Sequence, residues 1–177
     1  MRYGVLAAAM MLGACGAPDA DADGDGEISQ AEIGAAIDAA DEIKPEPGKY
    51  RATMTVVEAD IPGAPPEMIE MMRQSMTRTN EICITPAEAE NGFREAFSQQ
   101  NEDCTVNRFA LDGGDIDMAM TCSGQAESME MALSGTVAPT RSDLRMTMQG
   151  DVPGMGAMNI AMTMKQERIG DCDGSEA

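Results

Sequence analysis

The chain has 177 residues, of which 43% are hydrophobic, so it is long enough and apolar enough for one domain with a packed core. Its formal net charge of −19 argues against binding to nucleic acid or anionic lipid surfaces and favours binding of cations. Histidine is absent, which excludes catalytic triads, proton shuttles and zinc sites built on imidazole. Methionine contributes 18 residues and aromatic residues only 3%, so the interior has an unusual composition.

The first residues have the pattern of an export signal. Arg2 precedes a short apolar run that ends at Leu12 and is too short for a permanent membrane-spanning helix. The next residues complete the sequence LGAC, which resembles the lipobox of bacterial lipoproteins. We therefore expect residues 1–14 to be a lipoprotein signal peptide and Cys15 to carry the lipid anchor. Because the residue after Cys15 is not aspartate, the outer membrane, facing the periplasm, is favoured. The alternative is an ordinary signal peptide cleaved after Ala17.

The acidic stretch DADGDGEISQAE, residues 21–32, matches the calcium loop of an EF-hand at each specifying position. Gly26 stands at position six, where the loop turns sharply. Carboxylates at positions one, three, five and twelve, a backbone carbonyl at seven and a water-mediated contact at nine give the candidate ligands Asp21, Asp23, Asp25, Glu27, Ser29 and Glu32. The sequence therefore predicts calcium as the cofactor.

This loop departs from a complete EF-hand in two respects. The chain before it is too short for an entering helix, and no second loop follows to pair with Ile28 at position eight. Association between copies through Ile28 is therefore a hypothesis. An exiting helix is expected, because Ser29 and Glu32 have capping-box spacing. An incomplete EF-hand of this kind is expected to bind calcium weakly, with a Kd of about 10⁻⁴–10⁻³ M. Residues 15–45 are therefore predicted to be an acidic EF-hand-like segment and linker, and the alternative is an acidic tether without a metal.

From residue 46 onward apolar and polar residues alternate, as in strands that bury one face. Tyr50, Ala52, Met54 and Val56 begin the pattern, and methionine-rich alternation recurs up to Met164. Turns are expected at residues 113–114, 139–140 and 154–156. The count gives about seven strands. Residues 46–177 are therefore predicted to form a mainly β (α+β) domain, an antiparallel barrel-like sheet or sandwich with two short helices.

Apolar spacing and capping signals predict the two helices. The sequence PPEMIEMMRQSM, residues 65–76, places Met68, Met72 and Met76 on one helical face. The sequence TPAEAENGFREAFSQ, residues 85–99, opens with a threonine and a glutamate in capping-box spacing. Phe93 and Phe97 then lie one turn apart on its expected buried face.

Four cysteines remain after Cys15, an even number that favours two disulfides in an exported chain. Around the turn at residues 113–114, the inward-facing positions agree on both strands only if one residue between Val106 and Phe109 is bulged. That register favours the disulfides Cys104–Cys122 and Cys83–Cys172. The pairing of Cys83 with Cys104 and of Cys122 with Cys172 stays open. Redox catalysis is not expected, because the chain has no CxxC motif.

Several motifs together resemble a known family. They are PGKYRATMTV, IPGAPPEMIEMMRQSM, EICITPAEA, DCTVNRFALDGGDIDMAMTCSG and MTMQGDVPGMGAMNIAMTMKQERIGDC. In this order they are similar to the bacterial exported domain-of-unknown-function family 3617, over residues 46 to 173. The resemblance implies an exported, methionine-rich β domain with four cysteines, and it implies no activity or site residues.

The methionines have three interpretations: an apolar core face, the lining of a pocket for an apolar ligand, and a thioether site for Cu(I). The core interpretation is favoured.

No enzyme is expected, because no nucleophile and base stand at a defined spacing. The sequence predicts a calcium-binding, EF-hand-containing lipoprotein of the bacterial envelope with a binding or structural role. It would be held at the membrane through Cys15 and would not bind nucleic acid. The alternative is a periplasmic carrier of an apolar ligand or Cu(I).

Overall fold

The computed structural model describes residues 20–40, 43–91, 103–123, 128–152 and 156–174. The predicted signal peptide and Cys15 lie outside these residues, as do Phe93, Phe97 and the predicted turn near residue 154. Among the described residues, no helix is both long enough and apolar enough to cross a membrane.

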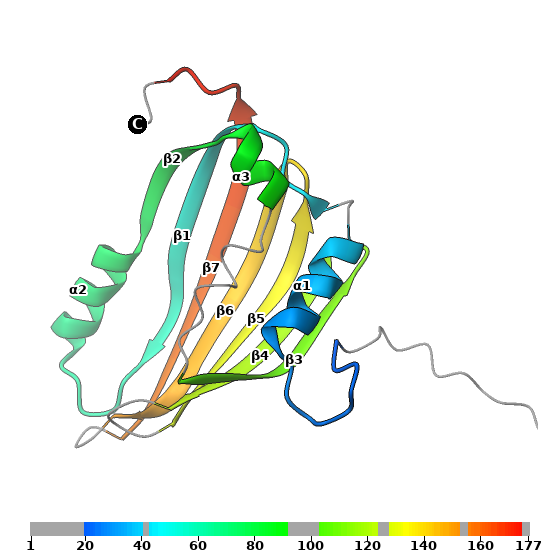
Figure 1. The fold of residues 1–177 in the computed structure, drawn as a ribbon. Coiled ribbons are helices and arrows are strands. Elements are labelled where there is room, and N and C mark those ends of the chain that lie inside the picture. The colour runs from blue at the N-terminus through cyan, green and yellow to red at the C-terminus, as the bar shows by residue number, and fades with distance from the viewer. Residues whose placement is uncertain (1–19, 41–42, 92–102, 124–127, 153–155, 175–177) are drawn as a thin grey trace, which may run out of the picture.

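In the described residues, seven strands form a single antiparallel sheet, whose arrangement is drawn in Figure 1. They are β1 Gly48–Asp60, β2 Arg78–Ile84, β3 Cys104–Asp112, β4 Asp115–Ser123, β5 Ser128–Ala138, β6 Arg141–Val152 and β7 Gly156–Gly170. The helices in the described part of the chain are α1 Gln30–Ala39, α2 Pro66–Met76 and α3 Pro86–Asn91. Strand order is β2-β1-β7-β6-β5-β4-β3, so β2 and β3 are the two edges. The mainly β prediction is confirmed, and the sheet is open, with neither barrel closure nor a second sheet within the described ranges.

The sheet has one apolar face and one polar face. Residues directly opposite each other in antiparallel strands project to the same side. One such line of residues crosses five strands and is entirely apolar: Met118, Leu133, Met146, Met162 and Val56. Threonines and charged residues occupy the other face, among them Arg51, Thr53, Thr163, Lys165 and Asp143. Alternation along each strand therefore directs the apolar side chains to the side that the helices cover.

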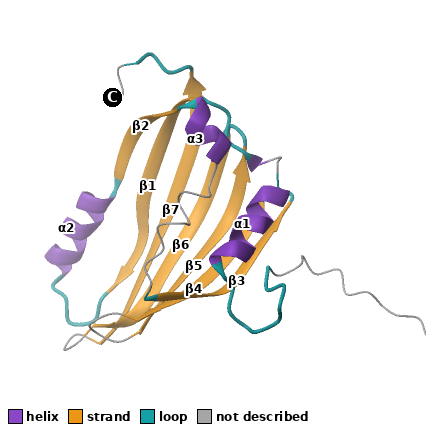
Figure 2. Ribbon diagram, in the orientation of Figure 1, coloured by secondary structure: helices purple, strands orange, loops and turns teal. Residues whose placement is uncertain are grey.

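The core consists of two clusters on this apolar face. The first packs Ile33 and Ile37 of α1 against Phe109 of β3, which is fully buried, and against neighbouring residues of β4 to β6. The second consists of Val56, Ile160 and Met162, with half-buried methionines of α2 beside them. Figure 2 shows α1 on the β3 side of the sheet and α2 beside β1. Each side chain buried in this way contributes about 1.5–3 kcal/mol to stability.

The α2 helix packs only part of its predicted apolar face. Met72 and Met76 lie against the second cluster, as their spacing predicts. Met68 and Met71 are exposed by 54% and 69%. No residue of this helix is fully buried, so α2 lies on the side of the sheet as an exposed amphipathic helix.

The acidic segment packs on the edge strand β3. The backbone N–H of Ala20 donates to the carbonyl of Phe109 (3.0 Å), and the N–H of Ile28 donates to the carbonyl of Val106 (2.9 Å). The Ile28 side chain belongs to the first core cluster. The prediction that Ile28 lacks a partner within the chain is therefore wrong. An edge strand has unpaired carbonyls. The Val106 carbonyl of β3 accepts the hydrogen bond from Ile28 that a second EF-hand loop would otherwise accept. The hypothesis of association through Ile28 loses its basis.

The described residues form two disulfides, Cys104–Cys122 and Cys83–Cys172. Cys104 stands directly opposite Cys122 in the β3–β4 ladder, and a register shift falls between Val106 and Arg108. These are the pairs and the bulge that the alternation favoured. One disulfide thus closes the β3–β4 hairpin, and the other ties the edge strand β2 to the residues after β7.

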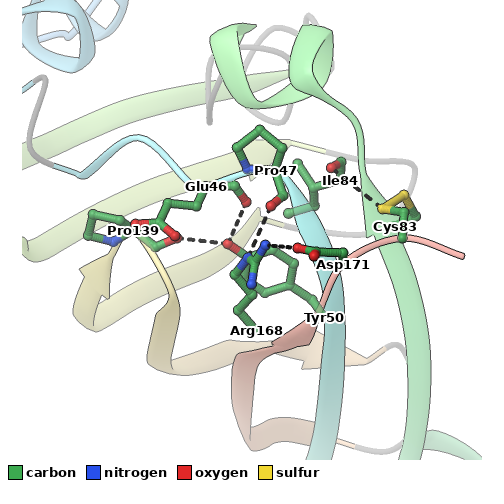
Figure 3. Close-up of polar contacts among 9 residues, drawn as sticks. Glu46, Pro47, Tyr50, Cys83, Ile84, Pro139, Arg168 and Asp171 are labelled. Atoms are coloured by element: carbon green, nitrogen blue, oxygen red, sulfur yellow. Dashed lines mark hydrogen bonds and ion pairs between the residues drawn. A yellow bond between two sulfur atoms is a disulfide. The ribbon is translucent and has the colours of Figure 1, made fainter.

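A polar cluster around Tyr50 joins three distant segments (Figure 3). The buried Tyr50 hydroxyl lies 2.7 Å from the backbone carbonyls of both Glu46 and Pro139. Beside it, Arg168 Nε donates to the Pro47 carbonyl (3.0 Å), and its guanidinium pairs with Asp171 (2.6 Å). Burial raises the pKa of Tyr50, although the positive charge of Arg168 partly opposes this. The cluster holds the start of β1, the β5–β6 turn and the end of β7 together.

Replacing Tyr50 by phenylalanine is expected to lower the free energy of unfolding by about 1–3 kcal/mol, because it removes a buried hydroxyl whose single proton is donated to one of these two carbonyls. Urea unfolding followed by circular dichroism measures this. The matched control is Thr79→Val, which removes the exposed hydroxyl contact with Thr53 (3.2 Å) and is expected to change stability by less than about 0.5 kcal/mol. Equal effects of the two substitutions would show that the cluster contributes no more than a surface contact.

Candidate metal centre

Three aspartates of the loop before α1 converge. Asp21, Asp23 and Asp25 each offer a carboxylate oxygen, and these three atoms lie within 4.8 Å of one another. Asp21 is half-buried, and the other two are exposed. Carboxylates this close repel each other unless a cation lies among them. Their oxygens are the hard donors that Ca²⁺ prefers.

The loop takes this shape because its carboxylates bind its own backbone. The Asp21 carboxylate accepts from the N–H groups of Gly24 (2.7 Å) and Gly26 (3.1 Å). The next two aspartates accept from N–H groups two residues further along, at 3.2 and 2.8 Å. Such Asx turns fold the chain back on itself. Gly26 has a φ of 87°, in the left-handed region that a residue with Cβ rarely adopts, so glycine is required at this sixth position.

Glu32, at position twelve, closes the loop. Its Oε2 accepts from the backbone N–H and the hydroxyl of Ser29, both at 2.8 Å, and the Glu32 N–H donates to Ser29 Oγ. The predicted capping box at the start of α1 is therefore confirmed. Glu32 Oε1 accepts a hydrogen bond from the N–H of Ala22 (2.8 Å), at the other end of the loop. These hydrogen bonds, with the one from the Ser29 backbone foremost, lower the pKa of Glu32 below its ordinary 4.5.

A second capping box shows which contact of Glu32 is specific to the loop. At the start of α3, Glu88 Oε2 accepts from the N–H (2.8 Å) and hydroxyl (2.7 Å) of Thr85, as Glu32 does from Ser29. The pKa of Glu88 is lowered for the same reason, again with the Thr85 backbone hydrogen bond as the first cause. Of these two glutamates, only Glu32 also accepts a hydrogen bond from a residue of an acidic loop, the N–H of Ala22. The bond to Ala22 is thus the feature beyond helix capping.

The remaining predicted ligands border the same hollow. Glu27 and Ser29 line a surface depression together with Asp23, Asp25 and Glu32. The start of β3, residues 104–106, also lines this depression. No sequence signal indicates that contact, because it joins segments about 80 residues apart. The oxygen-rich donor set fits a hard divalent cation.

The molecule is a disulfide-linked, methionine-rich antiparallel β domain with an acidic loop and helix at one edge. Its residues 45–172 match the model of a family described as a protein of unknown function, DUF3617. The chain belongs to this family, as the motifs predicted, and the loop and α1 precede the matched residues. No curated protein and no solved structure shows significant similarity to the chain.

Proposed function

We propose that the protein is a calcium-binding lipoprotein of the cell envelope, with a binding or structural role and no catalytic one. The observation that carries the calcium proposal is the convergence of Asp21, Asp23 and Asp25 in a loop that Glu32 closes. The LGAC sequence at residues 12–15 supports the lipid anchor on Cys15. The net charge of −19 agrees with a partner that is a cation.

In this proposal the loop residues would hold Ca²⁺, whose charge would relieve the repulsion among the aspartates. The Ile28–Val106 hydrogen bond and the burial of Ile33 join the loop and α1 to the sheet. A ligand that binds only the folded loop stabilises whatever must be folded with it, by about 2.7 kcal/mol at a hundredfold excess over Kd. Calcium would therefore stabilise the packing of α1 against the edge strand β3.

Glu32→Gln is expected to weaken calcium binding at least about tenfold, because loss of a charged bidentate ligand lowers affinity in such loops. Glutamine is itself acceptable in a capping box, so α1 keeps its N-terminal cap. Calorimetric titration of the full chain carrying Cys15→Ser, in detergent, measures the effect. A saturable 1:1 heat is expected for the parent.

The matched control is Glu88→Gln, the same change in the capping box of α3, and it is expected to leave the calcium titration unchanged. An absence of heat up to several millimolar calcium, the weak end of the range for such loops, would refute the proposal. Equal losses in the two variants would show that Glu32 acts as a helix cap and not as a ligand.

A further inference from the structure

Four methionines gather at one end of the apolar face. Met120, Met131 and Met148 are direct cross-strand neighbours on β4, β5 and β6. Met129 lies two residues before Met131 on β5 and therefore projects to the same face. Directly opposite residues have Cβ atoms about 4.5–5.5 Å apart, within reach of two long, flexible thioether side chains. We call these four residues the methionine cluster.

Core packing does not explain the whole methionine cluster. Met118 and Met162 show what core methionines look like here, with exposed fractions of 6% and 8%. The four cluster methionines are only half-buried, and of these Met120 packs against the first core cluster and Met148 against the second. Within the described ranges, Met129 and Met131 belong to neither core cluster and are not among the half-buried side chains packed against them. Gly150, directly opposite Met129, contributes no side chain that could pack against it.

The surroundings of the methionine cluster favour one class of ligand. The positions aligned with it on the same face are uncharged: Cys122, Gly150, Met158, Ile160 and Ala59. A hard divalent cation would lose its hydration there without gaining a charged oxygen. Thioethers are soft donors that select Cu(I). The chain has no histidine, and its four described cysteines are in disulfides, so thioethers are the soft donors in this part of the structure.

We propose that Met120, Met129, Met131 and Met148 form a binding site for Cu(I). The MxM spacing of Met129 and Met131 on one strand gives two donors on one face, and the neighbouring strands each give one more. This site is separate from the acidic loop: it has soft, uncharged donors where the loop has hard, charged ones. It does not depend on calcium binding.

The test is a competition for Cu(I) between bicinchoninate and the full chain carrying Cys15→Ser. Ascorbate is the reductant, because a thiol would reduce the disulfides. The triple variant Met120→Leu, Met131→Leu, Met148→Leu is expected to bind Cu(I) at least about 100-fold more weakly, since even outer-shell changes typically cost 10–100-fold in metal affinity. Leucine conserves volume, so the fold is expected to persist. The control Met54→Leu, Met68→Leu, Met71→Leu removes the same number of thioethers elsewhere and is expected to keep the affinity.

A second measurement uses the protein with an unsubstituted methionine cluster. It tests the Cu(I) site even if the triple variant does not fold. Titration with Ag(I), a soft monovalent ion with the same preference for sulfur, is followed through the ε-methyl NMR signals of the methionines. The four cluster signals are expected to shift together at one equivalent. Shifts confined to the exposed Met68 and Met71, no shift at all, or equal Cu(I) affinity in the two triple variants would each overturn the site. Glu32→Gln is expected to leave Cu(I) binding unchanged, which separates this proposal from the calcium one.

Discussion

Removing the Cys83–Cys172 disulfide, as Cys83→Ala with Cys172→Ala, is expected to lower the free energy of unfolding by about 4–5 kcal/mol. The two cysteines are 89 residues apart, and a cross-link across a long loop removes much conformational entropy from the unfolded chain. The disulfide also fixes the edge strand β2, whose side chains are exposed or only half-buried. Urea unfolding of the oxidised parent and the double variant measures the difference.

The second disulfide provides the comparison. Cys104 and Cys122 are only 18 residues apart, so Cys104→Ala with Cys122→Ala is expected to cost less, about 3 kcal/mol. The hairpin ladder on either side of this pair also holds the two strands together without it. The reverse order of the two losses would show that local packing, and not the length of the closed loop, decides what each disulfide contributes.

Strand register could be predicted where it depends on residues close in sequence. A short turn fixes which residues of β3 and β4 face each other, and a buried face then permits one register. The mismatch between Val106 and Phe109 required one bulged residue, and the structure has a register shift there. Cys104 opposite Cys122 followed from that shift. The same locality explains why the Ser29–Glu32 capping box could be recognised from the sequence.

Contacts between distant segments could not be predicted in this way. Alternation within β1 does not reveal that its neighbours are β7 and β2, nor that the sheet stays open at β3. The contact of Ile28 with Val106 depends on that open edge, and this is why the sequence suggested that Ile28 had no partner. In the candidate metal centre, the aspartates were predictable because one short loop carries them. That β3 lines the depression beside this loop could not be predicted. Likewise, period-two alternation predicted a methionine face but not which methionines lie outside the core clusters.

Phe109→Ala is expected to lower the free energy of unfolding by about 3–5 kcal/mol, since truncating a buried phenylalanine loses its transfer energy and leaves a cavity. Phe109 is fully buried in the cluster that includes Ile33 of α1. Its carbonyl also accepts the hydrogen bond from Ala20, just before the acidic loop. The cavity would therefore lie where α1 and the loop join the sheet. Chemical unfolding in the absence of calcium measures the loss.

The same substitution also tests whether the loop and the sheet are energetically coupled. If the packing of α1 holds the loop in its binding shape, Phe109→Ala is expected to weaken calcium binding as well, because part of the binding energy must then order α1. Ile160→Ala is the matched control: Ile160 is 5% exposed in the second cluster, away from α1, and its truncation is expected to cost about 2–5 kcal/mol. Calcium affinity is expected to fall for Phe109→Ala and to stay near the parent value for Ile160→Ala. Equal affinities in both variants would mean that the loop binds calcium independently of the sheet, and equal losses would mean that affinity follows global stability. The expected asymmetry would make β3 the element that connects the metal centre to the core.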